Sequence, residues 1–172
     1  MGFTVSYKVD VSKNIDELSE KVAKLLQNGA ETTNNYFTVA LSGGSTPKSI
    51  CQYLAKNYKN KILWNKIKFF WGDERCVPPS DLESNYRMAN QHLFAAIGLP
   101  ESNIFRIRGE EDPDSEAQRY AAKLTGLLPQ VNFSPQIDLI LLGLGEDGHT
   151  ASIFPYNIGL FVSDRLFVPS AH

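Results

Sequence analysis

Cysteine and histidine are scarce in this sequence, whose 172 residues include two cysteines and three histidines. Cys51 and Cys76 lie far apart and lack the spacing of metal ligands, so a zinc cluster is not expected. Two reduced thiols are the simpler interpretation, and a disulfide between them is the less favoured alternative.

Long apolar runs and a dominant charge are absent as well. No stretch approaches the ~20 apolar residues of a membrane helix, and the chain does not open on a basic region followed by an apolar run, so we expect a cytoplasmic protein without a signal peptide or membrane partner. The 17 Lys and Arg residues nearly balance 19 Asp and Glu. We therefore expect no general nucleic-acid binding, and an anionic ligand would need a local positive site.

Strand and helix patterns alternate along the chain. Apolar strands are predicted over residues 36–41, 67–71 and 137–142. Helical spacing is predicted over 15–26 with Gly29 as the stop signal, from Thr46 as N-cap, from Ser84 or Asn85 to Gly98, and from 112–113 to 124. This alternation predicts a mainly parallel sheet covered by helices on both faces.

Each predicted strand ends in a polar loop that contains glycine, namely residues 43–46, 72–75 and 145–149. Ligands of such sheets bind beyond the carboxyl ends of the strands. We therefore expect the three loops to meet in one cleft.

The first loop, Gly43-Gly44-Ser45-Thr46 followed by Pro47 at the start of a helix, suits an anion. Glycines allow close backbone approach, the two hydroxyls donate, and a helix start supplies free N–H groups. The loop does not match a Walker A loop, a dinucleotide fingerprint or a nucleophile elbow. An ordinary strand-to-helix turn explains the same residues equally well.

The second loop carries Asp73, Glu74 and Arg75. Arg75 is suited to grip a phosphate or carboxylate, and either acid is suited to orient a sugar hydroxyl or the arginine. A solvated turn with a local ion pair is the competing interpretation.

The third loop holds His149, which can accept a proton near neutral pH, with Asp147 two residues away to orient it. A histidine held by local backbone contacts is the alternative. His92 is expected to be a packing or surface residue in a helix, and His172 is a chain end.

Taken together, residues 41–47, 71–75 and 143–152 resemble the three signatures of the 6-phosphogluconolactonases. The helix start at 84–86 and residues 106–113 fit the same pattern, so the resemblance covers most of the chain. It implies a three-layer α/β/α sandwich related to glucosamine-6-phosphate deaminases. It also implies hydrolysis of 6-phosphoglucono-δ-lactone to 6-phosphogluconate in the oxidative pentose phosphate pathway, without metal or organic cofactor.

The resemblance also implies roles for individual residues. His149 corresponds to the general base, and Asp147 stays its orienting partner on the chemistry of the loop given above. Gly43, Gly44, Ser45, Thr46, Asp73 and Arg75 are the predicted binding residues for the phosphorylated substrate.

Two other functions stay open at this point. A deaminase continues its Gly-His motif with a segment containing a catalytic glutamate, whereas residues 150–155 contain none. A sugar-phosphate-binding protein without catalysis is the second alternative, because the family continues past residue 168 with further strands, a helix and a basic residue. Tyr156 also stands where the family usually has glycine. We therefore expect residues 1–172 to form a single α/β domain truncated at its C-terminus, and oligomeric state is not predicted.

Overall fold

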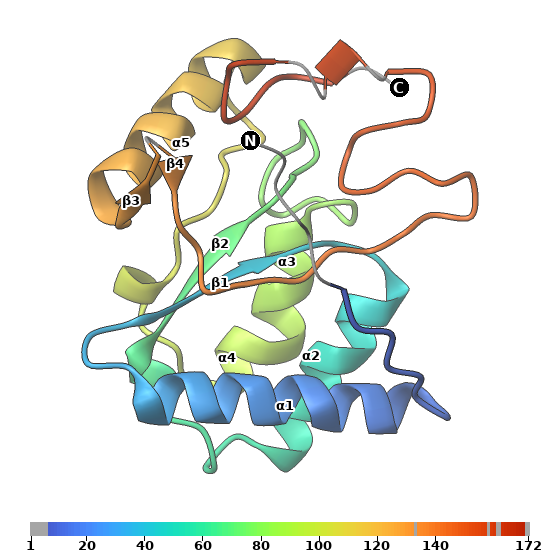
Figure 1. Cartoon of the computed structure of the whole chain (residues 1–172), viewed down its shortest axis with the longest axis vertical. Helices are drawn as coiled ribbons and strands as arrows, with labels where there is room; N and C mark the ends of the chain where they lie inside the picture. The colour runs from blue at the N-terminus through green and yellow to red at the C-terminus, as the bar shows by residue number, and fades with distance from the viewer. Residues whose placement is uncertain (1–6, 133, 158, 161–162, 171–172) are drawn as a thin grey trace.

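The protein is described by a computed structural model that covers residues 7–132, 134–157, 159–160 and 163–170. Its helices and strands alternate in the first two thirds of the chain (Figure 1). In order they are α1 (Ile15–Thr32), β1 (Phe37–Leu41), α2 (Ser45–Asn57), a 3-10 turn (Trp64–Lys66), β2 (Ile67–Trp71), α3 (Asn85–Ala89), a π-helical segment (Asn90–Phe94), α4 (Ala95–Ile97), a second 3-10 turn (Glu101–Asn103), α5 (Pro113–Leu127), β3 (Gln130–Val131), β4 (Ser134–Pro135) and β5 (Leu139–Ile140).

The main sheet has the order β2-β1-β5, and both pairings are parallel. Phe37 pairs with Ile67 and Val39 with Leu139, so the central strand β1 sets the register of both neighbours. Because all three strands run the same way, their carboxyl ends lie at the same edge. The predicted parallel sheet is confirmed.

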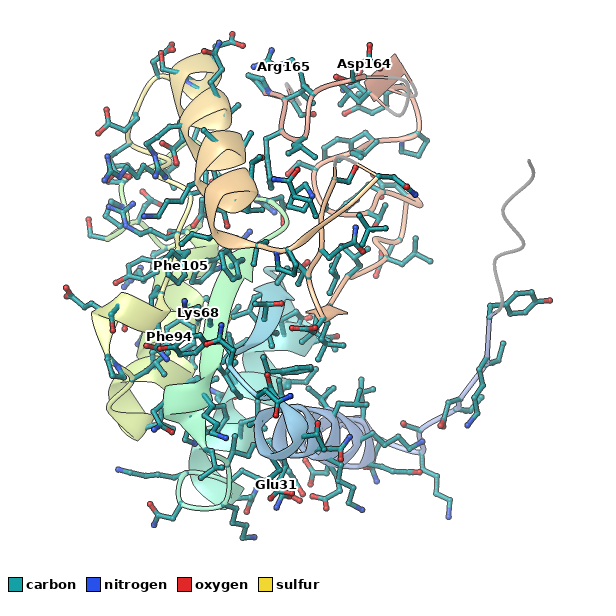
Figure 2. All side chains as sticks on the ribbon, turned by 60° about the vertical axis from the view of Figure 1, so that its left-hand side comes forward. Glu31, Lys68, Phe94, Phe105, Asp164 and Arg165 are labelled. Atoms are coloured by element: carbon teal, nitrogen blue, oxygen red, sulfur yellow. The ribbon has the colours of Figure 1, made fainter. Side chains whose placement is uncertain are left out.

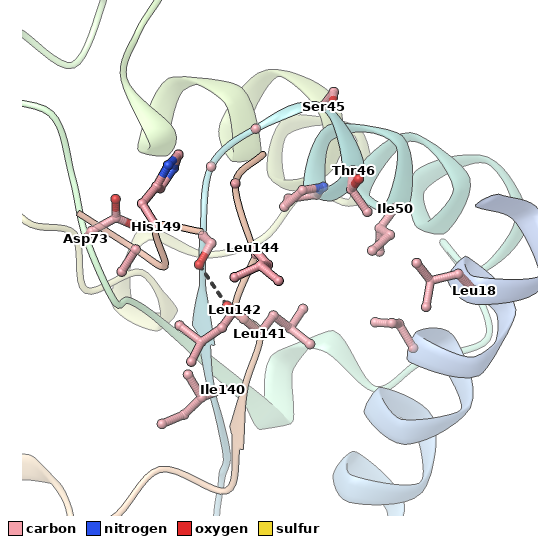
Figure 3. Close-up of a pocket in the computed structure, with 18 of the residues that line it drawn as sticks. Leu18, Ser45, Thr46, Ile50, Asp73, Ile140, Leu141, Leu142, Leu144 and His149 are labelled. Atoms are coloured by element: carbon pink, nitrogen blue, oxygen red, sulfur yellow. Dashed lines mark hydrogen bonds between the residues drawn. The ribbon is translucent and has the colours of Figure 1, made fainter. Parts of the chain in front are cut away.

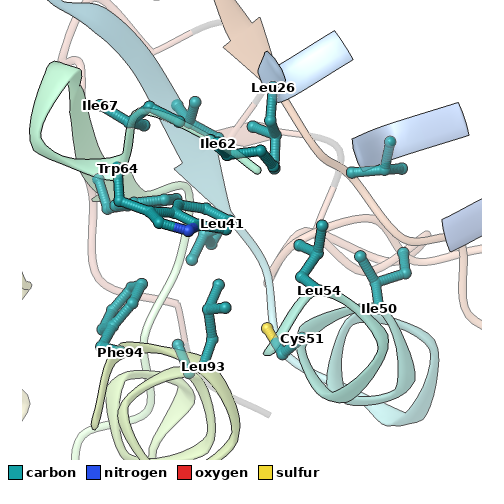
Figure 4. Close-up of a cluster of buried hydrophobic side chains, with 14 of the residues drawn as sticks. Leu26, Leu41, Ile50, Cys51, Leu54, Ile62, Trp64, Ile67, Leu93 and Phe94 are labelled. Atoms are coloured by element: carbon teal, nitrogen blue, oxygen red, sulfur yellow. The ribbon is translucent and has the colours of Figure 1, made fainter. Parts of the chain in front are cut away.

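Alternate residues of β1 and β2 bury opposite faces of the sheet. Val39, Phe69 and Trp71 belong to a core cluster with residues of α1, α2 and the segment from α3 to α4. Figure 4 shows part of this cluster, including Leu26 of α1 and Leu54 of α2. Ala40 and Phe70 instead pack with residues of α5. Both faces are covered, which explains why the strands are continuously apolar and confirms the three-layer α/β/α arrangement.

On the α5 face, Phe70 stacks on Phe105 with ring centroids 4.9 Å apart. Lys68 of β2 lies over the Tyr36 ring at 3.9 Å and near the Phe105 ring at 5.7 Å (Figure 2). The aliphatic stem of a lysine can cover apolar surface while its ammonium contacts the rings. Lys68 thereby adds to the cover of this face.

The starts of α3 and α5 follow the sequence signals. Ser84 accepts a hydrogen bond from the backbone N–H of Arg87, which makes it the N-cap of α3, and Asp112 caps α5 through Ser115. Asn14 caps α1 in the same way.

Helix α1 does not stop at Gly29, as its glycine predicted, and continues to Thr32. A Cβ on Gly29 would lie 2.5 Å from the ring of Phe37. Glycine here lets the start of β1 pack against the helix, and it does not end the helix.

Strand β5 is shorter than the predicted 137–142. Asp138, just before β5, contacts β1 through its side chain. Its Oδ2 accepts hydrogen bonds from the N–H (2.8 Å) and the hydroxyl (2.6 Å) of Thr38. After Ile140, one further backbone bond joins Leu141 to Ala40 before the chain diverges. The small antiparallel pair β3–β4 was not predicted.

Both cysteines are free: Cys51 lies in the core and Cys76 is exposed. Burial raises the pKa of the Cys51 thiol to about 12, so this thiol stays protonated and unreactive. None of the helices in the described part of the chain combines the length and apolar character that crossing a membrane requires.

Candidate active site

A pocket of about 590 Å³ lies at the carboxyl edge of the sheet. All three predicted loops contribute to it, together with the first turns of α2 and the inner face of α1. Figure 3 shows Asp73 and His149 on one side of this pocket and Ser45 and Thr46 on another. The described lining residues are Leu18, Val22, Ser42, Gly43, Gly44, Ser45, Thr46, Pro47, Ile50, Asp73, Arg75, Ile140, Leu141, Leu142, Gly143, Leu144, Gly145, His149 and Ala151.

Residues 42–47, here called the anion loop, lead from β1 into α2. The helix begins two residues earlier than predicted, because Gly44 rather than Thr46 occupies the N-cap position. Gly44 has φ 105°, a conformation that favours glycine. No side chain in the described part of the protein caps this helix, so the N–H groups of its first turn are available to an anion.

Arg75 lines the pocket from the loop after β2, residues 72–75, here called the Arg75 loop. Its Nε is buried and has no hydrogen-bond partner among the described residues. Oδ1 of Asp73 is also buried without a hydrogen-bond partner among the described residues. Oδ2 of Asp73 accepts a hydrogen bond from the Ser152 hydroxyl at 2.8 Å. Buried polar atoms without partners are rare, and their presence here favours a polar ligand.

Glu74, between these two residues, faces away from the pocket. Its carboxylate accepts hydrogen bonds from the N–H groups of Asn85 (2.7 Å) and Tyr86 (2.9 Å) and from the Ser84 hydroxyl (3.2 Å). A carboxylate is favourable at a helix N-terminus. Glu74 therefore anchors the Arg75 loop to α3 and accepts the Arg75 N–H at 2.8 Å, while it does not line this pocket.

His149 lines the pocket, and Asp147 lies behind it. Nδ1 of His149 is 2.5 Å from Oδ1 of Asp147, and the same oxygen accepts from the His149 backbone N–H at 3.1 Å. These hydrogen bonds lower the pKa of Asp147. An ionised Asp147 requires the proton on Nδ1, which leaves Nε2 as the basic nitrogen.

The environment of the His149 ring fixes its position. A Cβ on Gly145 would lie 2.2 Å from Cε1 of His149, so the ring lies directly against the glycine backbone. Phe154 packs beside the ring with centroids 4.9 Å apart. By contrast, His92 contacts Gln52 at 3.5 Å and does not line this pocket, and His172 lies outside the described residues.

Sequence reasoning missed Ser42 and Asn85. The Ser42 hydroxyl donates to the Leu141 carbonyl at 2.8 Å and joins the anion loop to the chain just after β5, which leads to the third loop. Asn85 joins the first and second loops, because its Nδ2 donates to the Asp73 carbonyl at 3.1 Å and its side chain packs on Gly43. The sequence signal for Asn85 was only a helix start, which gave no indication of these contacts.

Comparison with known proteins agrees with this geometry. Residues 10–172 match the profile of the family described as glucosamine-6-phosphate isomerases/6-phosphogluconolactonase. The chain belongs to this family. A 6-phosphogluconolactonase of Treponema pallidum is 38% identical over 94% of this chain and 68% of its own length. One from Haemophilus influenzae is 45% identical over 81% of this chain.

Solved structures of the family share the fold. The crystal structure of the devB protein superposes with a TM-score of 0.86 at 42% identity, over 92% of this chain and 66% of that one. A 6-phosphogluconolactonase from Trypanosoma brucei gives 0.77 at 32% identity, over 88% and 65%. The chain spans 58% of the length of the Haemophilus relative, so the activity of the whole protein is treated below as a proposal.

Proposed function

We propose that this protein hydrolyses 6-phosphoglucono-δ-lactone to 6-phosphogluconate. The observation that supports this most is the shared pocket: a histidine held by an aspartate lies in the same cavity as an uncapped helix start and an arginine with an unpaired Nε. The named family relatives are 6-phosphogluconolactonases. The free thiols of Cys51 and Cys76 support a cytoplasmic setting for the reaction.

The phosphate end of the substrate would bind between the anion loop and Arg75. The first-turn N–H groups of α2 and the hydroxyls of Ser45 and Thr46 supply donors, and Arg75 supplies the positive charge. This binding is remote from the reacting carbonyl. Its free energy would orient the lactone against His149.

The chemical step needs a base and no covalent nucleophile, because a lactone carbonyl is already electrophilic. Nε2 of His149 would take a proton from water as the water oxygen attacks C1. The tetrahedral intermediate then collapses, the C1 bond to the ring oxygen breaks, and that oxygen receives the proton from His149. The product acid ionises to a carboxylate. A positioned base of this kind contributes about 10²–10⁴ in rate.

Asp147 would hold the imidazole in the tautomer that this step requires and stabilise the imidazolium that forms. Because its pKa is lowered by the His149 hydrogen bonds, Asp147 is ionised at neutral pH. The charge partner of His149 is therefore present where the reaction runs.

The test is lactone hydrolysis measured as acid release, with the spontaneous reaction subtracted. We expect His149→Asn to lower kcat by about 10²-fold or more while the thermal unfolding midpoint changes little. His92→Asn is the matched control, because this histidine lies outside the pocket, and it should leave kcat unchanged.

Three results would contradict the proposal. An unchanged kcat in His149→Asn would remove this residue from the mechanism. Ammonia release from glucosamine 6-phosphate would instead identify a deaminase. Tight binding of 6-phosphogluconate with no turnover by the wild type would identify a sugar-phosphate-binding protein.

A further inference from the structure

Asn85 connects two of the three loops that form the pocket. It is the first residue of α3 and is only 4% exposed. Its Nδ2 donates a hydrogen bond to the backbone carbonyl of Asp73 at 3.1 Å. On its other side it lies against Gly43 of the anion loop. One side chain therefore lies between the loop that would donate to a phosphate and the loop that carries Arg75.

The contact with Gly43 explains why that position is glycine. A Cβ there would lie 1.7 Å from Oδ1 of Asn85 and 2.5 Å from its Cγ, which is sterically impossible without a shift. Gly44 has a positive φ, whereas Gly43 does not, so backbone conformation alone would accept alanine at position 43. The side chain of Asn85 is what excludes it.

Asn85 is itself held in place by Glu74. The Glu74 carboxylate accepts from the Asn85 N–H at 2.7 Å and from the Arg75 N–H at 2.8 Å. The helix start and the Arg75 loop therefore share one acceptor. A displacement of Asn85 would therefore change its position relative to both loops at once.

We propose that Asn85 is a positioning residue, which sets the separation between the anion loop and Arg75. Its expected effect on substrate rests on the proposed function, but its effect on the two loops does not. Because both loops hold the remote phosphate in the ground state and the transition state alike, a wrong separation should raise KM more than it lowers kcat.

A double-mutant cycle between positions 43 and 85 tests the contact. Gly43→Ala should weaken binding of 6-phosphogluconate about tenfold or more, as expected of overpacking a close contact. Asn85→Ala should weaken it as well, and raise KM for the lactone with kcat less affected. In the Asn85→Ala background, Gly43→Ala should add less than about twofold, since the clashing atoms are gone. Fully additive losses would overturn the proposal.

Asn103→Ala is the matched control. This asparagine is also buried, and its Nδ2 donates to the carbonyls of Asn65 (3.0 Å) and Ile67 (2.8 Å) at the opposite end of β2. We expect a lower unfolding midpoint and an unchanged Kd for 6-phosphogluconate. A general loss of stability would weaken ligand binding in both variants, and that result would contradict a positioning role.

The NMR shifts of the backbone amides separate this proposal from the proposed function. In Asn85→Ala, and in Asn85→Ser should the first variant fold poorly, the amide signals of Gly43 and Arg75 should both move, and in Asn103→Ala neither should. Unmoved signals would overturn the positioning role even in an active enzyme. The signals could move in Asn85→Ala although the wild type neither binds 6-phosphogluconate nor hydrolyses the lactone. That result would uphold the positioning role and reject the proposed function.

Discussion

Residues 73–75 divide their side chains between two tasks. Asp73 and Arg75 line the pocket, and Glu74 between them binds the start of α3. The sequence predicted the importance of this charged triplet, but not which residue points inward, because the acceptor role of Glu74 depends on a helix that begins eleven residues later.

Arg75→Ala should weaken phosphorylated ligands selectively. A charge-assisted hydrogen bond to a phosphate contributes about 1.5–3 kcal/mol, so the Kd for 6-phosphogluconate should rise about tenfold or more. The Kd for gluconate should change little. Isothermal titration of both ligands measures the difference.

Arg108→Ala is the control for this experiment. Arg108 is exposed and lines only neighbouring cavities. The Arg108→Ala substitution should leave the Kd for 6-phosphogluconate and the Kd for gluconate unchanged. Equal weakening of gluconate and 6-phosphogluconate by Arg75→Ala would give Arg75 a role other than phosphate recognition.

Among the elements, the short strand β5 depends on side-chain hydrogen bonds for its register. Oδ2 of Asp138 accepts from the N–H and the hydroxyl of Thr38, and the Asp138 N–H donates back to that hydroxyl at 2.9 Å. A one-residue slip would reverse the faces of Leu139 and Ile140. The reciprocal contact therefore aligns β5 with β1 before the loop that carries His149.

Asp138→Ala should lower the free energy of unfolding by about 1–3 kcal/mol, because it leaves the part-buried N–H and hydroxyl of Thr38 without their acceptor. Urea denaturation monitored by tryptophan fluorescence measures this change. Asp81→Ala, at an exposed turn where the side chain accepts from Glu83, is the comparison and should cost less. An equal loss of unfolding free energy in both variants would show that the β1–β5 contact stabilises the fold no more than an exposed turn does.

Elements buried by their own apolar residues were predictable, and those defined by distant partners were not. Strand β2 matches its predicted bounds of 67–71, because four of its five residues belong to one core cluster or the other. The end of α1 was wrong, because Gly29 accommodates Phe37 from the next strand. The cap of α2 was wrong by two residues, because Gly44 reaches a φ that threonine rarely adopts.

At the scale of the whole molecule, stability should depend on pH through the pair Arg106–Glu110. Two hydrogen bonds, 2.9 and 2.6 Å long, join the guanidinium to the carboxylate and lower the Glu110 pKa from 4.5 to about 2. Because the folded pKa lies below the unfolded one, this stabilisation is fully present above pH 4.5 and is lost as pH falls towards 2.

Glu110→Gln should therefore be less stable than wild type at pH 6, and the difference should shrink as the pH falls from 4.5 towards 3. Urea unfolding of the two proteins at several pH values measures it. A difference that stays constant over this range would show that the carboxylate charge does not contribute.

The location of the site followed from whole-molecule topology. Parallel strands end at a common edge, and this alone placed the glycine loops of residues 43–46, 72–75 and 145–149 in one region. The contacts that join those loops come from residues with ordinary local signals. Ser42 and Asn85 are examples, since only the folded chain places each of them beside a loop far away in sequence.

The central position of β1 also matters while the chain is being made. Among the described strands β1 is synthesised first, yet its contact between Thr38 and Asp138 spans 100 residues. At synthesis rates of roughly 5–20 residues per second, that edge of β1 waits about 5–20 s for its neighbour. During this interval an apolar strand with unpaired N–H and C=O groups is open to any other extended chain. The nascent protein is thus most exposed to misassociation before its site has begun to form.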